Sequence, residues 1–164
     1  IPFVAALHGA VVGGGLELAM AAHVRVCDDT ALFGLPEGQR GIFVGGGGTV
    51  RIQRVVGTTV MMDMMLTGRL LTPAEGLQEH VVRYVTPAGE ALAKANDLAA
   101  RIAKNSIDTN WMLINVLPRI HDMSHDDGLF VEQLNSARAR PPEAEARLRE
   151  FVDGKAKKLQ DNQA

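Results

Sequence analysis

The chain has 164 residues, of which 46% are hydrophobic and 22% charged, and its net charge at pH 7 is −2. These values are typical of a globular domain that buries a real core, and they exclude a disordered chain. The nearly balanced charge gives no positive field for nucleic acid or anionic lipid, so we expect neither partner.

Cysteine usage and the opening residues indicate the compartment. Cys27 is the single cysteine, so no intramolecular disulfide can form, and a reducing cytoplasm fits. The apolar opening is too short and too interrupted by glycine to span a bilayer. Because Ile1 already begins an apolar run, we expect further residues ahead of it.

The first part of the chain predicts a strand, a glycine loop and a helix. Residues 2–7 form a continuous apolar run, which is typical of a strand covered on both faces. Three glycines at 13–15 follow, and residues 16–22 favour a helix.

A second such unit comes next. Residues 23–27 and 31–33 predict two strands, and Pro36 ends the second one. A glycine run at 45–48 precedes two helical segments at 49–56 and 60–66.

From Thr72 onward the chain is predicted to be largely helical. Thr72 before Pro73 reads as a helix N-cap with proline in the first turn. Four further helices are expected at 90–103, 108–120, 129–139 and 144–158, separated by polar or proline-containing segments at 105–106, 126–128 and 141–142. We place a domain boundary near residue 87, with a core at 1–87 and a helical oligomerisation region at 88–164.

Two glutamates and a backbone amide are the candidates for chemistry. Gly14, ahead of a helix, leaves an N–H without an intrahelical acceptor, which suits an oxyanion. Glu17 lies about one helical turn away, and Glu37 follows the corner at Pro36. Two carboxylates beside an oxyanion site could perform acid/base chemistry next to a carbonyl. Glutamate at a helix start is, however, more often present for the helix dipole.

A set of motifs carries a resemblance to a known family. They are AALHGA at 5–10, GGGLELA at 13–19, FGLPE at 33–37, GGGT at 46–49, RVVG at 54–57 and LTGR at 66–69. Their order and spacing resemble the crotonase, or enoyl-CoA hydratase/isomerase, family over most of residues 2–85. The resemblance implies an α/β fold, a spiral of ββα units incomplete at its N-terminus, followed by a helical trimerisation region.

The resemblance also implies roles for individual residues. Gly14 matches the glycine whose amide forms half of the oxyanion hole, and the other half would precede Ile1. Glu17 matches the glutamate that activates water, and Glu37 matches the one that handles the proton at the alpha carbon. The predicted substrate-binding residues around them are Gly13, Gly15, Gly34 and Pro36.

The implied reaction is the reversible addition of water to a trans-2-enoyl-CoA, which gives the 3-hydroxyacyl-CoA. No metal or redox cofactor is expected, because coenzyme A is part of the substrate. A homo-oligomer is expected, either a trimer or a dimer of trimers. Alternatives are another crotonase reaction on an acyl-CoA, such as double-bond isomerisation, hydrolysis or a lyase step, and a non-catalytic oligomerising protein of this fold. His23 and the GQR segment at 38–40 depart from the usual pattern, which concerns the acyl preference.

Other signals point to structure instead. The glycines at 45–48 lack the lysine that a phosphate-binding loop needs before Thr49. His121 and His125 are four residues apart beside aspartates, but a solvated helix end explains them better than a metal site. Cys27 is expected to be a small buried residue.

Overall fold

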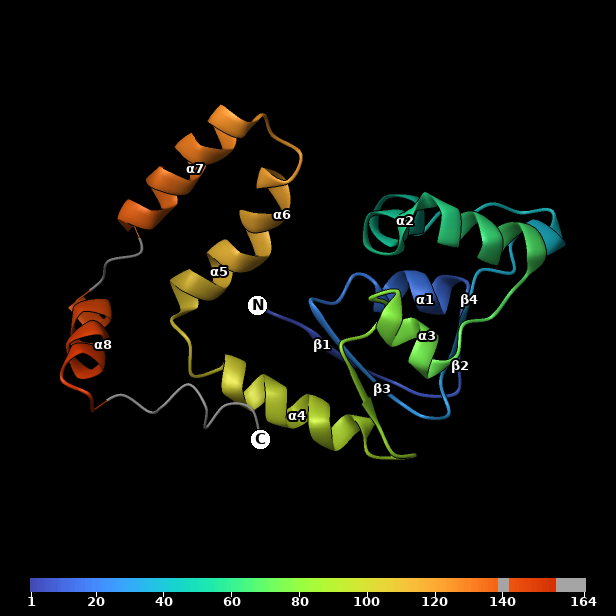
Figure 1. Cartoon of the computed structure of the whole chain (residues 1–164), viewed down its shortest axis with the longest axis horizontal. Coiled ribbons are helices and arrows are strands. Elements are labelled where there is room, and N and C mark those ends of the chain that lie inside the picture. The colour runs from blue at the N-terminus through green and yellow to red at the C-terminus, as the bar shows by residue number, and fades with distance from the viewer. Residues whose placement is uncertain (139–141, 156–164) are drawn as a thin grey trace. The chain divides into compact units, whose positions relative to one another are not determined.

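The structure, a computed structural model, describes residues 1–138 and 142–155 (Figure 1). The chain divides into two compact units, Ile1–Asn105 and Ser106–Ala164. The first unit contains β1 (Val4–Leu7), β2 (Ala10–Val12), α1 (Gly14–Ala19), β3 (Val24–Asp28), β4 (Leu32–Gly34), the 3-10 helix η1 (Gly38–Arg40), α2 (Gly48–Thr67), α3 (Pro73–Gln78), β5 (Tyr84–Thr86) and α4 (Ala91–Ile102). The second unit contains α5 (Ile107–Asn115), α6 (Leu117–Ile120), α7 (His125–Arg138) and α8 (Pro142–Val152).

Two small parallel sheets organise the first unit. One has the order β1-β3-β5 and the other pairs β2 with β4. The chain therefore runs twice through two strands and a helix, first as β1, β2, α1 and then as β3, β4, α2. This arrangement confirms the predicted α/β fold built from a spiral of ββα units.

Each strand pair changes sheet at a tight corner. Gly9, between β1 and β2, has φ of 59°, a left-handed conformation that glycine adopts without strain. Between β3 and β4, the buried Asp28 carboxylate accepts hydrogen bonds from Thr30 N (3.0 Å), Thr30 Oγ1 (2.5 Å) and Gly89 N (2.9 Å). These three bonds hold the pKa of Asp28 below its usual range.

The helix predictions for the first unit hold with small shifts. The helix predicted at 16–22 is α1, which begins two residues earlier and ends at Ala19. The two helices predicted on either side of residue 57 are joined in α2, but Gly57 itself has non-helical torsions (φ 79°, ψ 156°). Two strands of three residues each, β2 and β5, were not predicted.

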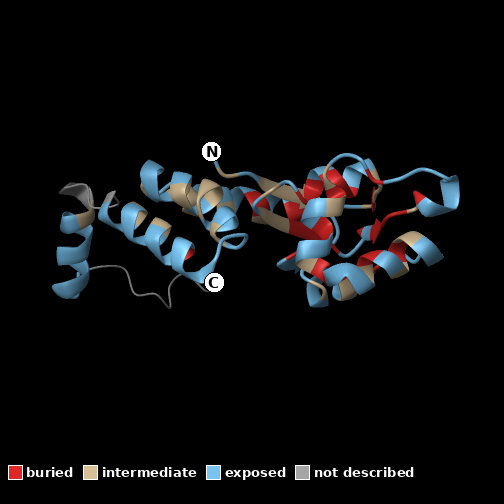
Figure 2. Cartoon of the chain, turned by 90° about the horizontal axis from the view of Figure 1, so that it is seen from above, coloured by how far each residue is buried: buried red, intermediate tan, exposed pale blue. Residues whose placement is uncertain are grey.

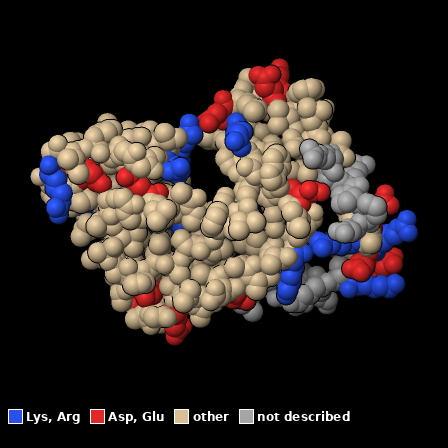
Figure 3. Space-filling view, turned by 180° about the vertical axis from the view of Figure 1, so that it is seen from behind, with Lys and Arg blue, Asp and Glu red and all other residues tan. Residues whose placement is uncertain are grey.

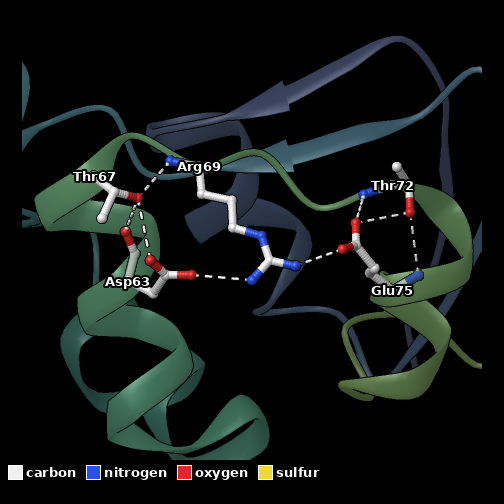
Figure 4. Close-up of polar contacts among 5 residues, drawn as sticks. All are labelled: Asp63, Thr67, Arg69, Thr72 and Glu75. Atoms are coloured by element: carbon white, nitrogen blue, oxygen red, sulfur yellow. Dashed lines mark hydrogen bonds and ion pairs between the residues drawn. The ribbon is translucent and has the colours of Figure 1, made fainter.

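The N-cap predicted at Thr72 is confirmed. The Thr72 side chain accepts from Glu75 N at 3.3 Å, and Glu75 Oε2 accepts from Thr72 N at 2.8 Å, which completes a capping box with Pro73 in the first turn (Figure 4). Arg69 links this cap to α2, because its guanidinium lies 2.5 Å from Glu75 and 3.1 Å from Asp63.

The core of the first unit lies among α1, the strands and the inner face of α2. Its fully buried large side chains are Phe33, Leu16, Leu35, Ile52, Met64, Leu71, Val26, Val81 and Val82. Helix α4 packs on β1 and β3 through Ala91 and Ala95, which lie against Val26. Since α4 belongs to this unit, the boundary predicted near residue 87 falls inside it, and the observed division follows Asn105.

The second unit is a series of helices with little buried surface of its own. Figure 2 shows its described residues as almost entirely exposed or intermediate, whereas buried residues gather in the first unit. The single helix predicted at 108–120 is wrong, because the chain breaks at Val116 into α5 and α6, with Pro118 in the first turn of α6.

The break predicted at 126–128 is also wrong, since these residues form the first turn of α7. Ser124, just ahead of the helix, accepts a hydrogen bond from Asp127 N at 3.2 Å and donates to the Asp127 carboxylate at 2.6 Å. Gly128 fits within the helix because it packs on Ile120 of α6. The helix predicted at 144–158 corresponds to α8; residues 139–141 and 156–158 of these predictions lie outside the described residues.

Charges are dispersed over the face shown in Figure 3, where acidic and basic side chains are interspersed among uncharged residues. This distribution agrees with the small net charge. Among the described residues, no helix combines the length and the apolar character needed to cross a membrane.

Candidate active site

Parallel pairing of β2 with β4 brings the predicted site residues to one edge of a sheet. The register pairs Val12 with Gly34, and Gly13 N donates to Gly34 O at 2.9 Å. Parallel strands end at the same edge, so the glycine corner after β2 and the Pro36–Glu37 corner after β4 become neighbours. Residues about 20 positions apart in sequence thereby reach one site.

Glu17 is a buried carboxylate that two loop amides hold. It lies in the first turn of α1, where Glu17 N donates to Gly13 O at 3.0 Å, and it is 7% exposed. Its Oε1 accepts from Gly46 N at 2.6 Å and from Gly48 N at 2.8 Å. Hydrogen bonds from amides to a carboxylate are charge-assisted and fix its direction.

The loop amides can reach Glu17 because these loop positions have no side chain. A Cβ on Gly46 would lie 3.0 Å from Glu17 Oε2, and a Cβ on Gly48 would lie 2.9 Å from Glu17 Oε1. Both distances are shorter than an ordinary van der Waals contact. The glycine run at 45–48 therefore wraps the carboxylate of Glu17.

Glu37 is the second buried carboxylate, with 6% of its surface exposed. Its backbone is fixed by η1, since Glu37 O accepts from Arg40 N (3.0 Å) and Ile42 N (3.1 Å). Oε1 lies 2.9 Å from the position that a Cβ on Gly13 would take. Oε2 is buried and has no hydrogen-bond partner in the described part of the chain. An unsatisfied buried carboxyl oxygen is costly, and such groups are concentrated at functional sites.

The glycine corner leaves space for a ligand beside the helix start. Gly14 is the first residue of α1, so its N–H has no acceptor within the helix. Gly14 and Gly15 are exposed, and a Cβ on either would meet nothing within 4 Å. Gly13 adopts φ of 55° and N-caps the helix.

The other two predicted substrate-binding residues have structural contacts. The Leu70 side chain occupies the space that a side chain on Gly34 would need, so the close approach at Gly34 is made by Leu70. Pro36 is half-buried at the corner that leads into Glu37. Their contact with substrate stays a prediction.

Two apolar cavities lie beside these segments. One, of about 330 Å³, is lined by Phe43, Thr49, Gln53, Thr58, Met61, Met62, Met65 and Leu66. The other, of about 430 Å³, runs along β1 and the outer face of α1 and includes Gly15 and Leu18. Neither has a glutamate in its lining.

Cys27 and His23 take structural positions. Cys27 is fully buried, which confirms the predicted small buried residue, and burial raises the pKa of its thiol to about 11. The His23 ring stacks on Phe3 with ring centroids 6.1 Å apart, and its Nδ1 accepts from Phe3 N at 2.9 Å. Partial burial lowers the pKa of His23.

His121 caps the end of α6, and His125 begins α7. His125 lies 3.1 Å from its neighbour Asp126, and both side chains are largely exposed. In the described ranges, no three His, Cys, Asp or Glu side chains form a group that could hold a metal ion.

The sequence did not identify the partners of Glu17. The amides of Gly46 and Gly48, and Arg51, which donates from Nη1 to Gly46 O at 3.0 Å, were not assigned to the site. The available signal was the glycine run itself, which indicated close approach of backbone but not what it approaches.

Comparison with known proteins identifies the family of this chain. Residues 1–140 match the family model described as enoyl-CoA hydratase/isomerase. A fatty acid oxidation complex subunit alpha from Shewanella sp. (strain ANA-3) is 44% identical over 119 residues, which is 71% of this chain and 17% of that protein.

Solved structures share the fold over nearly the whole chain. A crystal structure from Rhodopseudomonas palustris CGA009, provisionally named an enoyl-CoA hydratase, is 47% identical with a TM-score of 0.90, covering 94% of this chain and 60% of that one. An enoyl-CoA hydratase from Bacillus anthracis is 27% identical with a TM-score of 0.85, covering 93% of this chain and 60% of that one. The chain thus spans about a sixth of the curated relative and three-fifths of the solved ones. The match over 140 residues shows that this chain belongs to the enoyl-CoA hydratase/isomerase, or crotonase, family.

Proposed function

We propose that this chain forms the acid/base site of an enoyl-CoA hydratase, which adds water reversibly to a trans-2-enoyl-CoA and gives the 3-hydroxyacyl-CoA. The observation that carries the proposal is a pair of buried carboxylates on segments that follow two paired strands. Glu37 lies against Gly13, and Glu17, in the helix turn that Gly13 begins, is held by the amides of Gly46 and Gly48. Family membership supports the substrate class, an acyl-CoA thioester.

In the proposed mechanism the Gly14 N–H donates a hydrogen bond to the thioester oxygen, on which negative charge grows. Stabilising this charge lowers the barrier to addition at the beta carbon. Glu17 removes a proton from water as the water oxygen bonds to the beta carbon, and Glu37 supplies the proton to the alpha carbon. Glu37 must therefore start each cycle protonated, and it regains a proton when Glu17 releases the one taken from water. With both groups restored, the sum is one water added across one double bond, and the reverse reaction follows the same steps backward.

The way Glu17 is held suits a base that activates water. Both loop amides bond to Oε1, which leaves Oε2 available to accept the proton. Glu37 Oε2 is buried and has no hydrogen-bond partner among the described residues, which suits a group that exchanges a proton with the alpha carbon. An isomerase that moves a double bond needs one such group, whereas hydration uses both.

The test compares Glu17→Gln with Glu37→Gln in the complete gene product. Hydration of crotonyl-CoA is followed by loss of absorbance of the conjugated thioester. We expect each substitution to lower kcat by about 10²- to 10⁴-fold, because each removes one acid/base group. Full isomerase activity in Glu17→Gln on a 3-enoyl-CoA, without hydration by the wild type, would instead support the isomerase alternative. If the wild-type protein neither hydrates nor isomerises any enoyl-CoA tested, the result would support the non-catalytic alternative.

The remaining expectations go with this proposal. Coenzyme A enters as part of the substrate, and no metal or redox cofactor takes part in the mechanism. The protein is expected to assemble as a trimer or a dimer of trimers and to work in the cytoplasm.

A further inference from the structure

We propose that Arg51 is a positioning residue for Glu17, acting through the glycine loop that holds the carboxylate. This inference rests on the proposed function, and it assigns a role to a side chain outside the acid/base pair. Three successive peptide groups of the loop carry the inference. The first and third donate hydrogen bonds to Glu17, and the second accepts one from Arg51.

The first and third of these peptides donate to Glu17. The Gly45–Gly46 peptide gives the Gly46 N–H, 2.6 Å from Glu17 Oε1, and the Gly47–Gly48 peptide gives the Gly48 N–H, 2.8 Å from the same oxygen. Both must keep their orientation for the carboxylate to stay in place, because hydrogen bonds weaken steeply with misalignment.

The peptide between them is held by Arg51. Its Nη1 donates to Gly46 O at 3.0 Å. The backbone of the same residue holds the next carbonyl, since Arg51 N donates to Gly47 O at 3.0 Å. Arg51 therefore holds two consecutive carbonyls, those of Gly46 and Gly47. The peptides before and after the one that carries Gly46 O supply the N–H groups that bind Glu17.

The loop has space for this arrangement on both faces. Gly47 has φ of 93°, and the Arg51 guanidinium fills the position that a Cβ at Gly47 would need. The Glu17 carboxylate crowds the corresponding positions of Gly46 and Gly48. The glutamate thus contacts the loop at Gly46 and Gly48, and the arginine contacts it at Gly47 between them.

Arg51 is exposed and lies in the first turn of α2, so it contributes little to the core. Among the described residues, Arg51 forms no ion pair with an acidic side chain. Its hydrogen bond to Gly46 O is to a neutral carbonyl, which points to orientation of the loop as its role.

The test uses Arg51→Met and Arg51→Lys in the complete gene product, with Lys104→Met as the matched control. Lys104 is an exposed cation of the first unit, remote in sequence from the loop. We expect Arg51→Met to lower kcat for hydration about 10- to 100-fold, the scale of a misplaced catalytic group, with KM changed less than about threefold. Arg51→Lys should recover part of the loss, and Lys104→Met should match the wild type.

Two further readouts separate positioning from general damage. In a Glu17→Asp background the shorter side chain no longer reaches the amides of Gly46 and Gly48. Adding Arg51→Met to this background should lower kcat less than about threefold, because both substitutions act on the same contact. Hydrogen exchange at Gly46 and Gly48 should accelerate in Arg51→Met, while exchange in α4 stays unchanged.

Each outcome decides the inference. Wild-type hydration together with an unchanged kcat in Arg51→Met overturns the role of Arg51 and leaves the proposed function standing. The role of Arg51 is also overturned if Arg51→Met lowers kcat as much in the Glu17→Asp background as in the wild type. Unchanged hydrogen exchange at Gly46 and Gly48 in Arg51→Met overturns it too. If the wild type shows no hydration, the proposed function fails, and the exchange measurement still tests the grip on the loop.

Discussion

Glu37 Oε2 is a buried carboxyl oxygen that finds no hydrogen-bond partner among the described residues. Leaving such a group unpaired costs about 1–3 kcal/mol, so a fold selected for stability alone would not keep it. In the proposed hydratase the same oxygen handles the proton at the alpha carbon. Stability and activity should therefore oppose each other at this position.

This opposition predicts an unusual phenotype for Glu37→Gln. The amide has nearly the same shape but cannot exchange a proton, so hydration should be lost. The free energy of unfolding should change by less than about 1 kcal/mol, because the substitution removes no hydrogen bond of Oε2. Urea unfolding and the crotonyl-CoA assay on one preparation test both halves. A clear loss of stability would show that the carboxylate has a partner that the substitution removes.

Two adjacent glycines offer a matched comparison in the loop. A Cβ on Gly46 would lie 3.0 Å from Glu17 Oε2, whereas a Cβ on Gly45 would meet nothing within 4 Å. Gly46→Ala should lower kcat about tenfold or more by displacing the carboxylate, while Gly45→Ala should stay within about twofold of the wild type. Equal effects of the two substitutions would mean that the loop responds to loss of flexibility and not to crowding at Glu17.

At the scale of elements, a polar clasp joins the end of α2 to the start of α3 (Figure 4). Arg69 bridges Asp63 and Glu75, and Thr72 shares three hydrogen bonds with Glu75. Removing the cap with Thr72→Ala should lower the free energy of unfolding by about 1 kcal/mol, the usual cost of losing a threonine N-cap. Thermal unfolding at neutral pH measures this loss, and Thr72→Ser should restore most of it.

The clasp also predicts acid sensitivity. The backbone N–H of Thr72, its hydroxyl and Arg69 lower the pKa of Glu75 from 4.5 to about 2. Because the folded protein keeps Glu75 ionised where the unfolded chain protonates it, its contribution is complete above about pH 4.5 and declines as pH falls toward 2. The stability difference between wild type and Glu75→Gln should therefore shrink from about pH 6 to about pH 3. A constant difference would exclude this linkage.

Elements with a strong local signal could be predicted from the sequence, and those set by distant partners could not. The cap at Thr72 and Pro73 is encoded in adjacent residues, so it was predicted correctly. Strand β2 has three residues, too few to show a period, and it exists because β4 pairs with it. The break between α5 and α6 was missed because the helical periodicity of residues 108–120 runs through Pro118, which stands in the first turn of α6.

The candidate site shows the same limit. Glu17 and Glu37 were predicted from motifs, and the structure buries both beside glycines. The bonds from Gly46 and Gly48 to Glu17 span about 30 residues, and the grip of Arg51 depends on a left-handed Gly47. No local pattern states which side chain a glycine loop will enclose.

For the whole molecule, the second unit raises the question of what covers its apolar side chains. Large hydrophobic residues are exposed on every helix described there: Ile107, Trp111, Leu113, Leu117, Leu129, Phe130, Leu134, Leu148, Phe151 and Val152. Within the described residues only Gly128 of this unit is buried. Exposed apolar surface on this scale is typical of an interface, which supports the predicted homo-oligomer.

Helix α7 provides the sharpest test of that assembly. Phe130 and Leu134 are one turn apart on one face and are 61% and 57% exposed. The double substitution Phe130→Glu and Leu134→Glu should shift the complete gene product toward monomer, because burying two carboxylates in an apolar interface is prohibitively costly. Glu132→Gln, an exposed change on the same helix, should leave assembly intact.

Light scattering after size-exclusion chromatography gives the mass of each variant. An unchanged oligomer in the double variant would place the contact elsewhere, and a monomeric wild type would refute the assembly, since these side chains would then stay in water without a partner.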